Sequence, residues 1–137
     1  MISFNYETDF SLANENMLSD WISKAIELEN LKEGDINYIF CDDEYLHKLN
    51  VKFLNHDTLT DIISFDYTIG KIIQGDIYIS IERVRDNAKD FKVSFLEEVN
   101  RVMIHGVLHY CGYKDKTTQD ASEMREKENH YLAMLGY

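Results

Sequence analysis

The sequence predicts an α+β domain, in a mixed α/β arrangement where a sheet of about four strands packs against about five helices. Short β-branched or alternating stretches recur along the 137-residue chain, and between them apolar residues repeat at helical spacing. Hydrophobic residues make up 45% of the chain, which is enough for a core. The chain has no proline and no visible repeat, so we expect one domain over residues 1–137.

The N-terminal half is expected to form two strand–helix pairs. Residues 2–6 alternate apolar and polar side chains, as a strand does. A helix follows to about Leu31, and Gly34 is expected to end that unit. The apolar run at residues 36–41 predicts a buried strand. A second helix, opened by an aspartate cap, is expected to run to about Phe53.

The C-terminal half is expected to form a hairpin followed by three helices. Residues 61–67 and 75–81 predict its two strands, which a loop around Gly70 connects. Ser94 begins the sequence SFLE, a capping box that marks the start of a helix. The three helices are expected at residues 80–91, 95–111 and 120–135.

The charge of the chain limits its partners. Acidic side chains number 25 and basic ones 14, so the net charge is −11. A field of this sign repels phosphates, and a nucleic-acid partner therefore needs local basic groups or a docking protein. No apolar run is long enough to cross a membrane, and the first residues lack a signal-peptide pattern. We expect a cytoplasmic protein without a membrane partner, and the sequence indicates no oligomeric state.

The stretch from His105 to Asp115 carries the candidate chemistry. His105 and His109 lie four residues apart on a predicted helix, so their imidazoles share one face and can bind one cation. Gly112 lets the chain leave the helix, and Asp115 can then return as a third ligand. Three protein ligands leave one position open, as in catalytic zinc sites. We expect one divalent metal, with zinc as the leading candidate, although such a set also suits iron(II).

The zincin-like HxxxH spacing lacks one residue of the zinc peptidases. Their HExxH pattern places a glutamate, the general base, directly after the first histidine. This chain has Gly106 at that position. A conventional peptidase mechanism therefore lacks its base.

Five segments together resemble one known family. HGVLHYCGY at residues 105–113 resembles the HGxLHLxGYDH signature of the YbeY family of metal-dependent endoribonucleases. LTDIISF at residues 59–65 is similar to the PTDVLSF segment of that family, and QGDIYIS at residues 74–80 to its LGDIxIS segment. The Leu-Asn pair at 49–50 and the MxxKE pattern at 124–128 also match. The matching segments occur in the same order as in the family and cover nearly the whole chain.

The resemblance implies a four-stranded sheet with packed helices and a metal cleft between the motif helix and the sheet. It also implies single-strand-specific RNA cleavage, in maturation of the 3′ end of 16S ribosomal RNA and in ribosome quality control. The ribosome or a ribosomal protein is then an expected partner. Two positions depart from the family. Asp115 replaces its third histidine, and Leu54 replaces an arginine suited to phosphate contact, for which Lys52 or His56 could substitute.

Four further residues are catalytic candidates, each with an ordinary structural alternative. Asp61 and Asp76 lie at strand ends, where they could orient water or bond a ligand histidine, or only cap a turn. Ser64 could line the cleft or bond to backbone. Arg101, one turn before the first histidine, could meet phosphate or pair with a glutamate of its own helix.

Three functions therefore compete at the level of the sequence. The first is an endoribonuclease that acts on ribosomal RNA. The second is a zinc peptidase-like hydrolase, or an iron oxygenase, built on the same helix. The third is a ribosome-associated binding protein whose metal is only structural.

Overall fold

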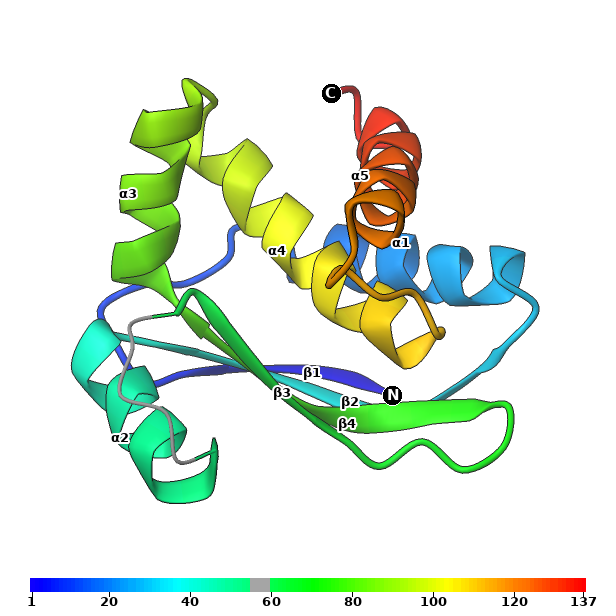
Figure 1. Ribbon diagram of the computed structural model, residues 1–137, viewed down its shortest axis with the longest axis horizontal. Helices are drawn as coiled ribbons and strands as arrows, with labels where there is room; N and C mark the ends of the chain where they lie inside the picture. The colour runs from blue at the N-terminus through cyan, green and yellow to red at the C-terminus, as the bar shows by residue number, and fades with distance from the viewer. Residues whose placement is uncertain (55–59) are drawn as a thin grey trace.

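A computed structural model describes residues 1–54 and 60–137 (Figure 1). The described residues form four strands and five helices, so the predicted α+β architecture is confirmed. The strands are β1 (Ile2–Tyr6), β2 (Lys32–Cys41), β3 (Ile62–Asp66) and β4 (Ile72–Ser80). The helices are α1 (Glu15–Leu28), α2 (Asp43–Leu54), α3 (Ile81–Phe91), α4 (Phe95–Tyr110) and α5 (Thr118–Ala133).

The strands form one mixed sheet in the order β1-β2-β4-β3. β1, β2 and β4 run parallel, and β3 pairs antiparallel with β4, which confirms the predicted hairpin. The expectation that Gly34 ends the first unit is wrong, because β2 begins at Lys32 and contains this glycine. Lys32 pairs with Ile72 of β4, and the register shifts by one residue between Glu33 and Ile36, as at a β-bulge. This pairing at the start of β2 joins segments far apart in the chain, so no local sequence pattern predicts it.

Helices cover the two faces of the sheet unequally. Figure 1 shows α1, α4 and α5 above one face and α2 against the other. The main core lies under α1 and α4, and a smaller cluster around Leu46 lies under α2. Buried hydrogen bonds tie the layers together: the Tyr38 hydroxyl donates to the Met103 carbonyl at 2.8 Å, and the Trp21 indole donates to the Tyr131 carbonyl at 2.8 Å.

Local signals set both ends of α4, the helix that carries the two histidines. The Ser94 hydroxyl accepts the Glu97 amide at 3.1 Å, as the capping box predicts. At the other end Gly112 has φ 104°, a backbone conformation that favours glycine. Thr117 then caps α5 by accepting the Asp120 amide at 3.0 Å. Within residues 1–54 and 60–137, no helix combines the length and apolar character of a membrane span.

Candidate metal centre

The two histidines and the aspartate meet at one point on the rim of the sheet. The Nε2 atoms of His105 and His109 are 3.0 Å apart. An Asp115 carboxylate oxygen lies 3.3 Å from Nε2 of His105 and 3.2 Å from Nε2 of His109. The structure therefore brings together the three residues that the spacing singled out, and their donor atoms form a nearly equilateral triangle.

The size of this triangle fits a divalent ion. Bonds of about 2.0–2.1 Å to a tetrahedral zinc place two ligand atoms about 3.3 Å apart. An octahedral ion with similar bonds places neighbouring ligands about 3.0 Å apart. The observed sides span these two values. Two imidazoles and a carboxylate are donors that zinc and iron(II) both accept, so the residues fit such an ion without choosing between the two metals.

Gly106 explains how α4 can lie so close to the sheet. A Cβ atom at this position would lie 3.0 Å from the Ile77 side chain and 3.2 Å from that of Ile62. Position 106 therefore faces β3 and β4, while His105 and His109 line a pocket beside the sheet. A glutamate here would bury its charge against two isoleucines, which is unfavourable. The general base of the zinc peptidases has no place at this position.

A hydrogen-bonded anchor holds the loop that carries Asp115. The Tyr113 hydroxyl donates to Glu29 at 2.7 Å, and Lys127 pairs with the same carboxylate at 3.3 Å. The Tyr131 hydroxyl also donates to Glu29. The loop after Gly112 is thus fixed to the end of α1 and to α5, two residues before Asp115.

Glu128 of α5 orients His105 from behind. One of its oxygens lies 2.6 Å from Nδ1 of His105, and the other accepts from Arg101 at 3.0 Å. A histidine that donates through Nδ1 presents Nε2 to a metal, and such carboxylate–histidine pairs are common around metal sites. Sequence analysis matched Glu128 to the family's MxxKE pattern but assigned it no role. Only the packing of α5 on α4 shows this contact.

The pKa values of this pair follow from its burial and its charges. Burial lowers the pKa of His105, but the Glu128 carboxylate, together with Asp115 and Asp61, raises it above its usual value. Burial raises the pKa of Glu128, but His105 and Arg101 lower it by more. The pKa of Glu128 is therefore below its usual value. A proton therefore competes with a metal for His105, and metal binding should release protons.

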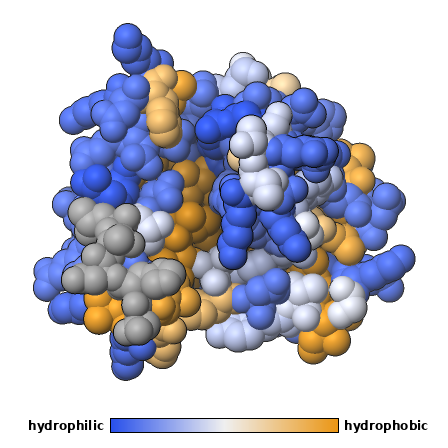
Figure 2. Space-filling model, in the orientation of Figure 1, coloured by the Kyte–Doolittle hydropathy of each residue, from blue (hydrophilic) through white to orange (hydrophobic). Residues whose placement is uncertain are grey.

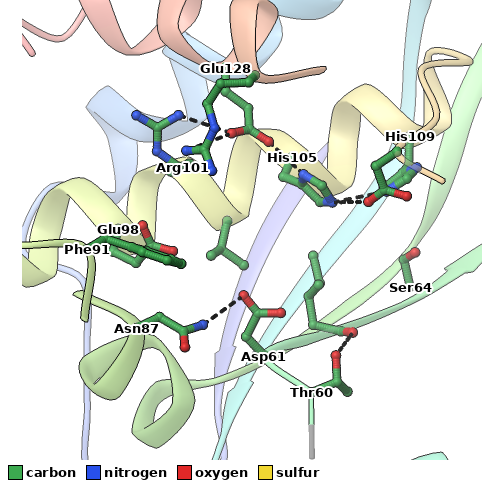
Figure 3. A pocket seen from close by; sticks show the side chains of 14 residues that line it. Thr60, Asp61, Ser64, Asn87, Phe91, Glu98, Arg101, His105, His109 and Glu128 are labelled. Carbon is green, nitrogen blue, oxygen red and sulfur yellow. Dashed lines mark hydrogen bonds and ion pairs between the residues drawn. The ribbon is translucent and has the colours of Figure 1, made fainter. Parts of the chain in front are cut away.

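The triangle stands at one end of a pocket of about 480 Å³. Figure 2 shows this face of the molecule hollowed at its centre, with an apolar floor between hydrophilic walls. Figure 3 shows His105 and His109 at one end, Glu98 and Phe91 at the other, and Asp61 across from α4. The metal ligands and Glu98 therefore line one continuous pocket.

Two carboxylates in the pocket have raised pKa values. Burial raises the pKa of Asp61, and the nearby His105 and an Asn87 hydrogen bond of 3.4 Å only partly offset this. Burial also raises the pKa of Glu98 to about 7, with Arg101 opposing and Asp61 reinforcing the shift. Glu98 is 4% exposed. The sequence indicates Glu98, like Glu97, only as a glutamate of the same helix with which Arg101 could pair.

The other sequence candidates divide between the pocket and the rest of the fold. Asp61 and Ser64 line the pocket. Asp76 does not, because it alternates with Ile77 along β4 and bonds Asn37 at 3.0 Å on the opposite face. Arg101 lines the pocket but pairs with Glu128 and, at 3.9 Å, with Glu97.

Of the two candidates to replace the family's arginine, the structure describes Lys52, which does not line the pocket. Lys52 lies on α2, where its ammonium stands 5.2 Å from the centre of the Phe53 ring. Leu54 is the last residue of α2 and is exposed. His56 lies outside the described residues.

Fold and site together define a small α+β protein with a candidate metal site beside its sheet. A model of the Endoribonuclease YbeY family matches residues 2–136, and the chain belongs to this family. The resemblance that the sequence motifs indicated is therefore confirmed.

Relatives and a solved structure agree with this assignment. A protein of Flavobacterium johnsoniae named Endoribonuclease YbeY is 67% identical over 98% of this chain and 97% of its own length. One of Flavobacterium psychrophilum with the same name is 63% identical over 98% and 96%. The solution structure of TM1509 from Thermotoga maritima matches with a TM-score of 0.70 and 30% identity, covering 96% of this chain and 87% of that one.

Proposed function

We propose that this chain is a metal-dependent endoribonuclease that cleaves single-stranded RNA, with ribosomal RNA as its substrate. The observation that carries the proposal is the triangle of His105, His109 and Asp115, whose sides of 3.0–3.3 Å suit one divalent ion. Membership of a family named for endoribonuclease activity supports the reaction class. The whole of residues 1–137 acts as one domain in this proposal.

Zinc is the metal we propose for this site. A divalent cation held by these three side chains supplies Lewis acidity, which polarises a phosphoryl group and lowers the pKa of water. Asp115 carries a negative charge where a third histidine would be neutral. This charge should weaken the Lewis acidity, so we expect activity to need a higher pH than a three-histidine site needs.

The chain's own groups have distinct tasks in this proposal. Glu128 holds the His105 ring, and Arg101 holds Glu128, so both are positioning residues. Asp61 faces the site from the other wall, and burial raises its pKa, which favours a role for this carboxylate as a proton acceptor. Ser64 offers a hydroxyl on the same wall. Arg125 lines the pocket, is half exposed and lies 3.6 Å from Glu128, so its guanidinium can meet a phosphate.

We further propose that the protein acts in the cytoplasm, on or near the ribosome. A net charge of −11 repels the phosphates of free RNA. A partner that holds the chain beside the RNA would overcome this repulsion. The peptidase alternative is disfavoured because position 106 packs against isoleucines and cannot present a glutamate to the site.

One experiment separates the candidate functions. The purified protein is incubated with single-stranded RNA and with casein, each with and without chelator, and compared with the variants His109→Ala and His130→Ala. His130 is an exposed histidine of α5 outside the pocket, so it controls for loss of a histidine. We expect RNA cleavage that chelator and His109→Ala abolish and that His130→Ala preserves. Cleavage that survives in His109→Ala would refute the proposal.

A further inference from the structure

The pocket continues well beyond the metal ligands. Glu98 and Val102 line it from α4, and Asn87 and Phe91 line it from the last turns of α3. Glu98 precedes His105 by seven residues, so it lies on the same face of α4, about 10 Å along the helix axis. Figure 3 shows Asn87, Phe91 and Glu98 at the end of the pocket away from His109. The proposed chemistry uses none of them.

Glu98 is the unusual residue of this end. Its side chain is buried, with 4% of the residue exposed, and it lines the pocket. Among the described residues, none donates a hydrogen bond to its carboxylate. The carboxyl opens on the pocket, and burial raises its pKa to about 7, so the protonated form is well populated below neutral pH. The neutral acid offers one donor and one acceptor side by side to a ligand.

Phe91 and Asn87 give this end the features of a site for a flat polar ring. Phe91 is 57% exposed although it is a large aromatic residue, and it stands at the pocket wall. Asn87 donates to Asp61 at 3.4 Å, which leaves its amide oxygen as an acceptor. Val102 adds an apolar surface. An exposed aromatic ring beside a hydrogen-bonding pair is how proteins hold unstacked bases of single-stranded RNA.

We propose that this end of the pocket, the base subsite formed by Asn87, Phe91, Glu98 and Val102, holds one unpaired nucleobase of the substrate. The base stacks on Phe91, and its edge bonds with Glu98 and Asn87. This inference rests on the proposed endoribonuclease function and adds a recognition site to it.

The base subsite also fits the charge of the chain. Stacking on an aromatic ring requires no cations, whereas phosphate contacts do. A chain with 25 acidic and 14 basic side chains is therefore better suited to bind RNA through a base than through its phosphates. A base held beside Glu98 also accounts for selection of single strands, because a paired base cannot enter the pocket.

The test compares two exposed phenylalanines. Phe91→Ala removes the proposed stacking ring, Phe91→Trp keeps one, and Phe53→Ala removes an equally exposed ring on α2, since Phe53 is 56% exposed. The affinity of each metal-loaded protein for a short single-stranded RNA is measured by fluorescence anisotropy, and a gel checks that the RNA is intact. We expect Phe91→Ala to weaken binding about 5- to 150-fold. Phe91→Trp and Phe53→Ala should bind as the unaltered protein does.

A second measurement identifies the base. Removing one base at a time from the RNA should weaken binding to the unaltered protein at one position, and the same removal should have no further effect in Phe91→Ala. Equal affinity of Phe91→Ala and the unaltered protein, or an undiminished effect of base removal in the variant, overturns the base subsite. If RNA cleavage persists in that case, the endoribonuclease proposal stands. If the unaltered protein neither binds nor cleaves RNA, both proposals fail.

Discussion

The buried carboxyl of Glu98 makes stability depend on pH in a calculable way. Its pKa rises from 4.5 in the unfolded chain to about 7 in the folded protein, so the folded state binds the proton more tightly. The contribution of Glu98 to stability is therefore complete below pH 4.5 and is lost as the pH rises through about 7. A difference of this size corresponds to about 3 kcal/mol of unfolding free energy at high pH.

The variant Glu98→Gln removes this titration and keeps the shape of the side chain. Between about pH 5.5 and pH 8.5 the unaltered protein should lose about 2 kcal/mol of stability that the variant does not lose. Titrating groups that do not interact with Glu98 are shared by both proteins and cancel in the difference. At alkaline pH the glutamine variant is therefore expected to gain stability relative to the unaltered protein.

Urea unfolding of both metal-free proteins at several pH values measures the difference directly. The variant Glu126→Gln, at an exposed position of α5, is the matched control for the loss of one carboxylate. Parallel curves for Glu98→Gln and the unaltered protein over this pH range would refute the reasoning, because they would show that the carboxyl is ionised at the same pH in both states.

Three further predictions concern the metal site. Glu128→Gln should weaken zinc binding about 10- to 100-fold, because the amide holds the His105 ring less firmly, and competition with a chelator measures this. Zinc at a hundred times its dissociation constant should raise the melting temperature of the unaltered protein by about 10 °C. Tyr113→Phe removes a hydrogen bond to the Glu29 carboxylate and should cost about 2 kcal/mol in urea unfolding.

Each of these predictions has a result that contradicts it. Unchanged zinc affinity in Glu128→Gln would mean that Glu128 does not orient the ligand. An identical zinc-dependent shift of the melting temperature in Asp115→Ala would mean that zinc binds elsewhere. Unfolding of Tyr113→Phe at the same urea concentration as the unaltered protein would mean that the loop needs no anchor.

Local patterns predicted the helix that carries the site. The Ser94 cap and the glycine at 112 gave both ends of α4, because each acts through hydrogen bonds or dihedrals within a few residues. The four-residue spacing placed His105 and His109 on one face. Helical spacing does not bury every apolar residue, since Leu96 in the first turn of α4 is 57% exposed.

Contacts between distant segments could not be predicted in this way. Glu128 meets His105 across 23 positions because α5 packs on α4. The anchor from Tyr113 to Glu29 spans 84 positions. The position of Asp76, in contrast, has a local signal. It precedes the apolar Ile77 on the same strand, and neighbouring strand residues point to opposite faces of the sheet.

The central claim is that the side chains of His105, His109 and Asp115 bind one ion. Anomalous diffraction from a crystal of the zinc-loaded protein tests it most directly. We predict a single peak about 2.0–2.2 Å from both Nε2 atoms and from an aspartate oxygen. A map with no peak between the two imidazoles, or a peak that Asp115 does not approach, would contradict the account.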